Sequence, residues 1–130
     1  MKTFVEFRSK KFPPYNGEEE EINPGLWGKR LAEYFAAKLP EHGIEPNEII
    51  PEDWGWYIPI KNEGAELALC CGHQYGDDDV FLCFTDPQKP TVRKLFKKID
   101  VTEALTRLTA AVDGILAADS EIHDISWREP

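Results

Sequence analysis

The middle of the chain, from Ile44 to Phe84, alternates short β-type segments with turn residues, and this alternation restricts the fold more than any other feature. Segments rich in β-branched and aromatic residues are typical of strands, and clusters of Gly, Asn and Asp are typical of the turns between them. Short strands joined by brief turns pair antiparallel. The sequence therefore predicts an antiparallel meander with strands at Glu48–Ile50, Trp54–Ile60, Glu66–Cys71 and Val80–Phe84.

Helical periodicity flanks this block on both sides. With Asn23 as the N-cap and Pro24 at the first helical position, apolar residues recur on one helical face as far as Leu39. A second helix is predicted to run to residue 116, with Asp100 and Glu103 as its capping pair. Two long amphipathic helices beside a mostly antiparallel sheet predict an α+β fold in which both helices pack on one face of the sheet.

The remaining segments complete this prediction. Phe4, Phe12 and the alternating residues around Val5 and Phe7 predict a first strand that Pro13-Pro14 ends, and Ile122–Trp127 predicts a final strand or an extended tail. The four glutamates Glu18–Glu21 are predicted to form a solvated loop whose negative charge interacts favourably with the dipole of the following helix. Thr91–Lys98 is interpreted as a short basic helix. With 130 residues and no internal repeat, the chain is expected to form a single α+β domain over residues 1–130.

The charge balance narrows the classes of partner. A formal net charge of -9 argues against binding to nucleic acid, which depends on Lys and Arg neutralising phosphates, and favours a basic protein as the partner. No window approaches the roughly 20 apolar residues of a membrane span, and no apolar run follows the N-terminus as a signal peptide requires. We therefore expect a cytoplasmic protein with no membrane partner.

One cluster of soft metal ligands occurs, at Cys70, Cys71, His73 and Cys83. If the hairpin turn between them centres on Asp77, Cys71 lies opposite Cys83 with His73 on the same face, which is close enough for three zinc ligands. The spaced C-x-x-C pairs of zinc sites are absent, so small buried side chains are the better explanation. The sequence predicts neither a metal nor a cofactor.

The sequence also favours a role without catalysis. Glu52 and Asp53 are adjacent carboxylates, but neighbouring residues on a strand point to opposite faces, which does not suit a catalytic acid pair. His42, His73 and His123 lie near no Gly-x-Ser-x-Gly motif, and there is no Gly-rich phosphate loop.

A single basic cluster interrupts this acidic chain. Its members are Lys89, Arg93, Lys94, Lys97 and Lys98. At helical spacing, Arg93 and Lys97 lie on one line of the helix surface and Lys94 and Lys98 on the next. A solvated helix face accounts for this pattern, and an anion-binding patch is the alternative.

The stretch from Pro51 to Tyr57 concentrates two carboxylates and three large aromatic rings around Gly55. In an extended segment, Trp54 and Trp56 project to the same face because side chains alternate with period two. This pair is either part of the core or an exposed aromatic platform for recognition. The predicted binding residues are Glu52, Asp53, Trp54, Trp56 and Tyr57.

Three motifs together resemble a family of small bacterial proteins without an assigned activity. They are Phe12-Pro13-Pro14, Asn23-Pro24-Gly25-x-Trp27-Gly28 and Glu52-Asp53-Trp54-Gly55-Trp56. The resemblance covers most of the chain and implies a bacterial origin and a compact single domain, but it brings no catalytic residues. In composition, a small acidic α+β protein rich in aromatic residues is also similar to bacterial immunity proteins, which block the active site of a partner toxin.

These observations leave three functional hypotheses. The first is a protein-binding module, such as an immunity or regulatory protein, in which Trp54 and Trp56 form an aromatic anchor with an acidic rim. The second is a small-ligand or enzymatic site around the Glu52–Trp56 motif, assisted by Tyr57 or His73. The third is a purely structural role for the motif.

Overall fold

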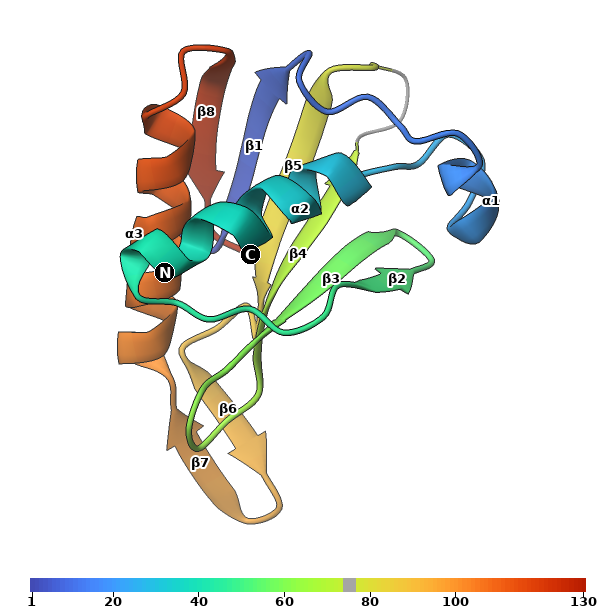
Figure 1. Cartoon of the computed structure of the whole chain (residues 1–130). Helices are drawn as coiled ribbons and strands as arrows, with labels where there is room; N and C mark the ends of the chain where they lie inside the picture. The colour runs from blue at the N-terminus through green and yellow to red at the C-terminus, as the bar shows by residue number, and fades with distance from the viewer. Residues whose placement is uncertain (74–76) are drawn as a thin grey trace.

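The centre of the fold is a six-stranded antiparallel sheet in the strand order β2-β3-β4-β5-β1-β8 (Figure 1). The computed structural model describes residues 1–73 and 77–130. Strands β2 to β5 follow one another in chain order, as the predicted meander requires, and β1 lies between β5 and β8. The strands are β1 Phe4–Ser9, β2 Ile50–Glu52, β3 Gly55–Ile60, β4 Leu67–His73, β5 Val80–Asp86 and β8 Ile122–Arg128.

Both long helical segments cover one face of this sheet (Figure 1). Helix α2 (Lys29–Lys38) continues into the 3₁₀ turn η1 (Leu39–His42), and helix α3 (Thr102–Ala117) precedes the edge strand β8. The predicted α+β architecture, with two helices on one face of an antiparallel sheet, is confirmed. None of the helices in the described part of the chain combines the length and the apolarity needed to cross a membrane.

The core fills the space between the helices and the covered face of the sheet. Period-two alternation in β1 turns Val5 and Phe7 inward, and Phe7 stacks on Phe81 of β5 with ring centroids 6.0 Å apart. Helix α2 contributes Phe35, and helix α3 contributes Leu105, both fully buried. Burial of large apolar side chains, at roughly 25 cal/mol per Å², is the main stabilising term of this layer.

The first long helix begins later than the sequence predicts. Asn23 does not cap it, because the Asn23 side-chain amide donates instead to the Asp53 carbonyl oxygen at 2.7 Å. The segment up to Gly28 forms turns, and Gly25 has a φ of 80°, which is outside the helical region. The predicted apolar stripe is nevertheless buried, since Leu26 and Trp27 reach the core from the turn before the helix.

The glutamate run is also structured, and its prediction as a solvated loop is wrong. Glu18–Glu21 form a single helical turn, α1, and Glu18 is 1% exposed. The Glu18 carboxylate accepts hydrogen bonds at the start of α2, which is the capping role predicted for Asn23.

Residues 91–100 form a hairpin, and the predicted basic helix is wrong. Strands β6 (Thr91–Lys94) and β7 (Lys97–Asp100) pair antiparallel as a separate two-stranded sheet that projects from the body (Figure 1). Val92 and Ile99 lie opposite each other in this pair, and both are half-buried against the core. So short a segment cannot distinguish helical from strand periodicity, and the packing of these two residues selects the strand.

Asp119 joins three segments at the end of α3. Its carboxylate accepts hydrogen bonds from Lys11 Nζ and Tyr34 Oη, both at 2.6 Å, and from the Glu121 backbone N–H at 2.9 Å. These hydrogen bonds lower the pKa of Asp119 to about 2, and the bond from Lys11 contributes most to this shift.

We expect Asp119→Asn to lower the free energy of unfolding at pH 7 by on the order of 1 kcal/mol, after allowance for solvent screening. The folded pKa lies below the ordinary value of 3.8, so this stabilisation is present above that value and is lost as the pH falls towards 2. Urea unfolding of both proteins at pH 7 and at pH 3 measures the difference. The gap should narrow at the lower pH, and a constant gap would contradict a charge-based contribution.

Candidate functional site

The predicted binding motif lies at the edge of the sheet, where a tight turn joins β2 to β3. Glu52 and Asp53 are exposed there, and Asp53 is held through its backbone carbonyl by Asn23. The turn covers Asp53 and Trp54, and strand geometry resumes only at Gly55. The motif is therefore a turn followed by a strand, not one continuous strand.

Trp54 and Trp56 lie on opposite faces of the sheet, so the predicted Trp pair does not form. Trp56 is 2% exposed and belongs to the core beneath the helices. Trp54 is 37% exposed and packs against Phe84, whose neighbour on the strand, Cys83, points into the core. Period-two alternation failed as a guide because Trp54 belongs to the turn rather than to β3.

Trp56 is fixed by the buried carboxylate of Glu18. The indole Nε1 of Trp56 donates to Glu18 Oε2 at 2.9 Å, and the backbone N–H groups of Gly28 and Lys29 donate to the same oxygen at 2.7 and 2.9 Å. The backbone N–H of Tyr15 donates to the other oxygen at 2.9 Å. Glu18 thus satisfies donors at the start of α2 and joins the α1 segment to the sheet. The sequence did not single out this residue, because nothing local distinguishes it from the three glutamates that follow.

Gly55 brings the β2–β3 turn into contact with the backbone of β4. A Cβ atom at Gly55 would overlap the carbonyl oxygen of Cys71, and a Cβ at Gly28 would lie 3.0 Å from the same oxygen. A Cβ at Gly72 would lie 3.2 Å from the carbonyl oxygen of Trp54. Three glycines distant in sequence therefore allow the turn, the start of α2 and β4 to approach closely.

On the uncovered face of the sheet, Trp54 begins a row of aromatic rings. Its ring centroid lies 5.5 Å from that of Phe84 on β5, and Phe84 stacks on Phe4 of β1 at 5.1 Å with an interplanar angle of 14°. The Arg128 guanidinium lies 5.9 Å from the Phe4 ring centroid and ends the row on β8. We call Trp54, Phe84 and Phe4 the aromatic row. It runs across the sheet on the face opposite the helices.

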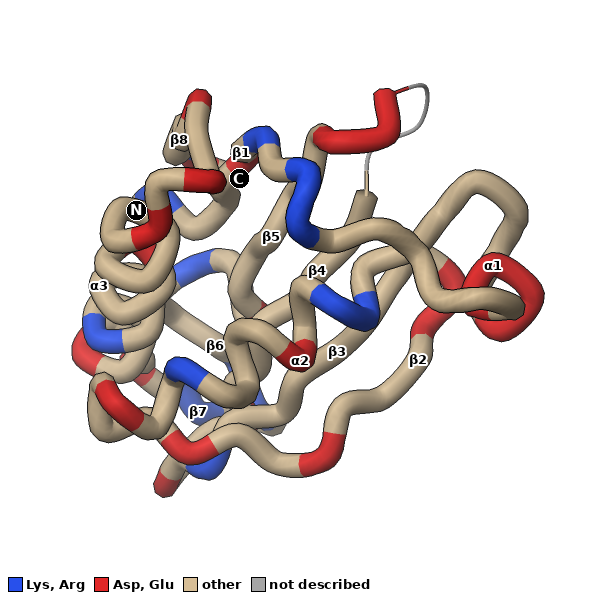
Figure 2. Tube along the Cα trace, turned by 45° about the horizontal axis from the view of Figure 1, so that its top comes forward, with Lys and Arg blue, Asp and Glu red and all other residues tan. Residues whose placement is uncertain are grey.

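Carboxylates occur near the Trp54 end of the aromatic row and beside Tyr57. Asp86 accepts a hydrogen bond from the Tyr57 hydroxyl at 3.1 Å, and burial, followed by the charge of Asp86, raises the pKa of Tyr57 to about 12. Glu52 and Asp53 lie beside Trp54 at the end of β2, and acidic residues also gather on α1 (Figure 2). Tyr57 is half-buried and positions Asp86.

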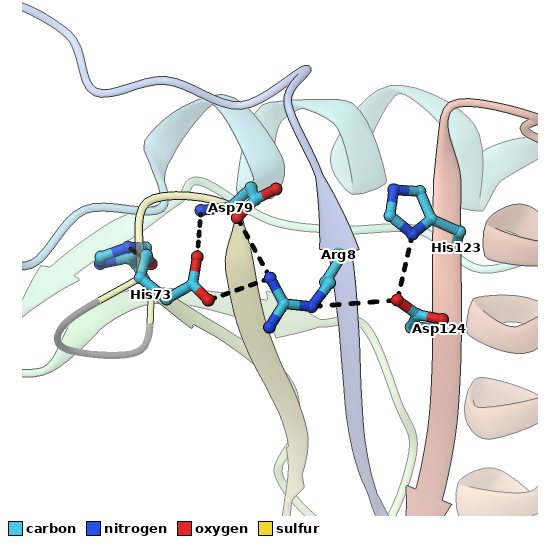
Figure 3. A network of polar contacts seen from close by, with 6 residues as sticks. Arg8, His73, Asp79, His123 and Asp124 are labelled. Atoms are coloured by element: carbon cyan, nitrogen blue, oxygen red, sulfur yellow. Dashed lines mark hydrogen bonds and ion pairs between the residues drawn. The ribbon is translucent and has the colours of Figure 1, made fainter.

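A network of polar side chains lies on this same uncovered face, around the end of β1 and the start of β5 (Figure 3). Arg8 Nη1 lies 2.9 Å from Asp77 and 3.4 Å from Asp79, and Arg8 Nε lies 3.8 Å from Asp124. Asp124 has a φ of 55° at a register shift between β1 and β8, which directs its carboxylate to Arg8. Hydrogen bonding to Asp77 raises the pKa of Arg8. This network joins β1, β8 and the segment before β5.

The Cys–His cluster adopts the predicted register without becoming a ligand set. Cys71 lies opposite Cys83, and His73 points to the same covered face. Both ring nitrogens of His73 already contact backbone carbonyls, Gly25 at 3.2 Å and Asp77 at 2.5 Å, and Trp27 stacks on the ring with centroids 3.5 Å apart. Burial raises the pKa of the Cys71 thiol well above its ordinary value. No group of three or more metal-binding side chains occurs among residues 1–73 and 77–130.

A cavity of about 740 Å³ lies beside Trp27, and the residues that line it lie outside the predicted motif. Its walls include Phe12, Pro14 and Trp27, with Asp78 and Asp79 at one side. None of the five predicted binding residues lines it.

The chain matches no protein-family model, no curated protein and no solved structure. The resemblance of its motifs to a bacterial family therefore stays an expectation.

Proposed function

We propose that this protein is a protein-binding module that engages a basic partner through the uncovered face of its sheet. Trp54 is the anchor, Phe84 and Phe4 extend the contact across the sheet, and Glu52 and Asp53 form an acidic rim. The single observation that carries the proposal is the aromatic row on the face opposite the helices. In this row Phe4 stacks on Phe84, and Phe84 packs at a tilt against the 37% exposed Trp54.

The aromatic row has the physical properties of an anchor. Aromatic rings provide large contact areas with few rotatable bonds, so they lose little conformational entropy on binding, and Trp and Tyr are enriched among the residues that dominate binding energy. Trp54 and Phe84 hold each other in position before any partner arrives. A pre-organised anchor lowers the entropic cost of association.

Charge supports a basic partner. The chain has a net charge of -9, and the exposed residues Glu52 and Asp53 directly precede Trp54 in the turn. Complementary charge accelerates encounter and selects among partners. An immunity or regulatory role, in which the basic partner is a toxin or an enzyme, is the specific form of this proposal. Three free thiols support a reducing compartment such as the cytoplasm.

The two alternatives account for fewer of the observations. The 740 Å³ cavity does not support a small-ligand site at Glu52–Trp56, because none of these residues lines it. A purely structural role explains the inner half of the motif, Gly55 and Trp56, but not the exposed Trp54.

The proposal is tested by affinity capture from a native lysate with the wild-type chain, Trp54→Ala and Glu52→Gln/Asp53→Asn. Trp54→Ala should weaken binding of the captured protein by about 2 kcal/mol, roughly 30-fold in Kd, because it removes the anchor ring. The charge variant should slow association and reduce its dependence on salt. Calorimetry and stopped-flow binding with the purified partner measure the two effects.

The matched control is Glu41→Gln/Glu103→Gln, which neutralises two exposed carboxylates elsewhere on the molecule. It should leave affinity unchanged. A partner that binds Trp54→Ala as tightly as the wild type, or that is acidic, would refute the proposal.

A further inference from the structure

The β6–β7 hairpin carries the two most exposed large apolar side chains in the described part of the chain. Leu95 is 88% exposed and Phe96 is 102% exposed, and together they form the two-residue loop at the hairpin tip. The hairpin extends away from the helices and the sheet (Figure 1). We call Leu95 and Phe96 the apolar tip.

The local chemistry of the turn does not explain the apolar tip. Leu95 has a φ of 56°, a left-handed conformation that branched apolar residues rarely adopt. Two-residue hairpin loops with a positive φ at the first position strongly favour Gly there. A leucine at this position is therefore unfavourable for the turn itself, and an outlier of this kind points to a function for the side chain.

Four cations surround the apolar tip. Lys94 lies opposite Lys97 on one face of the hairpin, and Arg93 lies opposite Lys98 on the other face. None of the four forms an ion pair with any residue that the structure describes. The sequence identified these residues as a basic cluster on a helix, whereas the hairpin arranges them as a collar directly behind two apolar side chains.

We propose that the β6–β7 hairpin docks onto an anionic lipid surface, with Leu95 and Phe96 entering the acyl boundary and the four cations contacting lipid phosphates. Apolar side chains followed at once by Lys and Arg match the order of layers in a membrane interface, where hydrocarbon lies beneath anionic headgroups. This site is independent of the aromatic row.

The form of the tip favours lipid over a macromolecule of fixed shape. Neither apolar side chain is held by neighbouring residues, so the tip is not pre-shaped for a pocket, and a fluid interface requires no shape complementarity. Because cations lie on both faces of the hairpin, all four can contact lipid headgroups when the tip meets a flat membrane surface end-on. The absence of a spanning helix does not bear on docking of this kind, because the tip lies in the interface and does not cross it.

The hairpin carries most of its positive charge away from the acidic body, although Lys94 lines a surface cavity that Glu66 of the body also lines. Asp100 is the only carboxylate within the hairpin, and it lies at the base, opposite Thr91. A four-residue strand spans roughly 13 Å, which exceeds the screening length of about 8 Å at physiological ionic strength. The tip cations therefore reach an anionic surface while the acidic groups of the body (Figure 2) are largely screened from it.

The test is co-sedimentation of the full chain with vesicles of phosphatidylcholine alone and of an equal mixture with phosphatidylglycerol. The wild type should bind the mixed vesicles, and its binding should fall steeply with added salt. Lys94→Glu/Lys97→Glu should reduce partitioning at least 10-fold, because each cation near an anionic surface contributes roughly a fivefold factor. Leu95→Gly/Phe96→Ser should reduce it by a similar factor or more.

The design separates binding from folding. Leu95→Gly relieves the left-handed strain, so this variant should melt at the same temperature as the wild type or higher, and its loss of binding cannot reflect unfolding. Lys2→Glu/Lys10→Glu changes the net charge equally at exposed sites elsewhere and should retain most of the binding.

Failure of the wild type to sediment with the mixed vesicles would overturn the proposal, as would equal binding by Leu95→Gly/Phe96→Ser. A photo-crosslinker at position 96 that captures a protein from a lysate, without vesicle binding, would instead assign the hairpin to a protein partner and also overturn it.

Discussion

Replacing Glu18 with Ala should lower the free energy of unfolding by about 3–5 kcal/mol, the largest effect expected for any exchange of a charged residue in this chain. The Glu18 carboxylate is buried and accepts four N–H groups: the backbone of Tyr15, Gly28 and Lys29, and the indole of Trp56. Alanine leaves all four donors without an acceptor in a place that water reaches poorly, and each unsatisfied buried donor costs on the order of 1–3 kcal/mol, an effect only partly additive.

Chemical unfolding followed by Trp fluorescence measures this loss. Glu18→Gln should have an intermediate effect, because the amide oxygen still accepts while its NH₂ group faces a donor. Glu20→Ala is the matched control, since Glu20 is exposed on the same helical turn, and it should change stability by less than about 0.5 kcal/mol. Equal losses for Glu18→Ala and Glu20→Ala would contradict the structural role of the buried carboxylate.

Gly55→Ala should lower the free energy of unfolding by about 2–4 kcal/mol. The added methyl group would overlap the Cys71 carbonyl oxygen, a backbone atom that cannot move without displacing β4 from its neighbours. Because β4 is a central strand of the sheet, the strain extends to the packing of Trp56 and of α2.

Gly64→Ala is the control for this experiment. Gly64 has a φ of 93°, so alanine there is strained by its backbone conformation, but no atom lies within 4 Å of the added Cβ. It should cost roughly 1 kcal/mol. Thermal melts of the two variants compare a steric collision with backbone strain alone, and a Gly55→Ala protein as stable as Gly64→Ala would show that the β2–β3 turn can move away from β4.

The predictions for Glu18 and Gly55 distinguish the residues of the Glu52–Tyr57 motif that stabilise the fold from Trp54, which we propose for recognition. Gly55 and Trp56 serve the fold, and their replacement is expected to reduce stability whatever the partner is. The Trp54 ring packs against Phe84 and keeps more than a third of the residue's surface exposed, so Trp54→Ala should still fold and test recognition separately. A combined Trp54→Ala/Trp56→Ala variant would confuse the two effects.

Local patterns were sufficient to predict the architecture of this protein. Short β-type segments separated by Asn, Asp and Gly determined the meander, because turn chemistry and strand alternation are set by neighbouring residues. The stripe at Leu105 and Leu108 determined α3 for the same reason, since helical periodicity is readable in any long segment. The register of Cys71 opposite Cys83 is the one expected if the hairpin turn centres on Asp77, but the sequence alone did not exclude a one-residue shift.

Contacts between distant segments decided the rest. The buried role of Glu18 depends on donors 3 to 38 residues away, so it could not be distinguished from Glu19–Glu21 by sequence. The separation of Trp54 from Trp56 depends on where the turn ends, which the close approach of Gly55 to β4 determines. The 91–100 segment became a hairpin because Val92 and Ile99 pack against the body, and a ten-residue segment has too few residues for periodicity to outweigh such packing. Local sequence patterns thus identified the meander and the two long helices, because these depend on neighbouring residues. Tertiary contacts decided the form of residues 91–100 and which side chains each element buries or exposes.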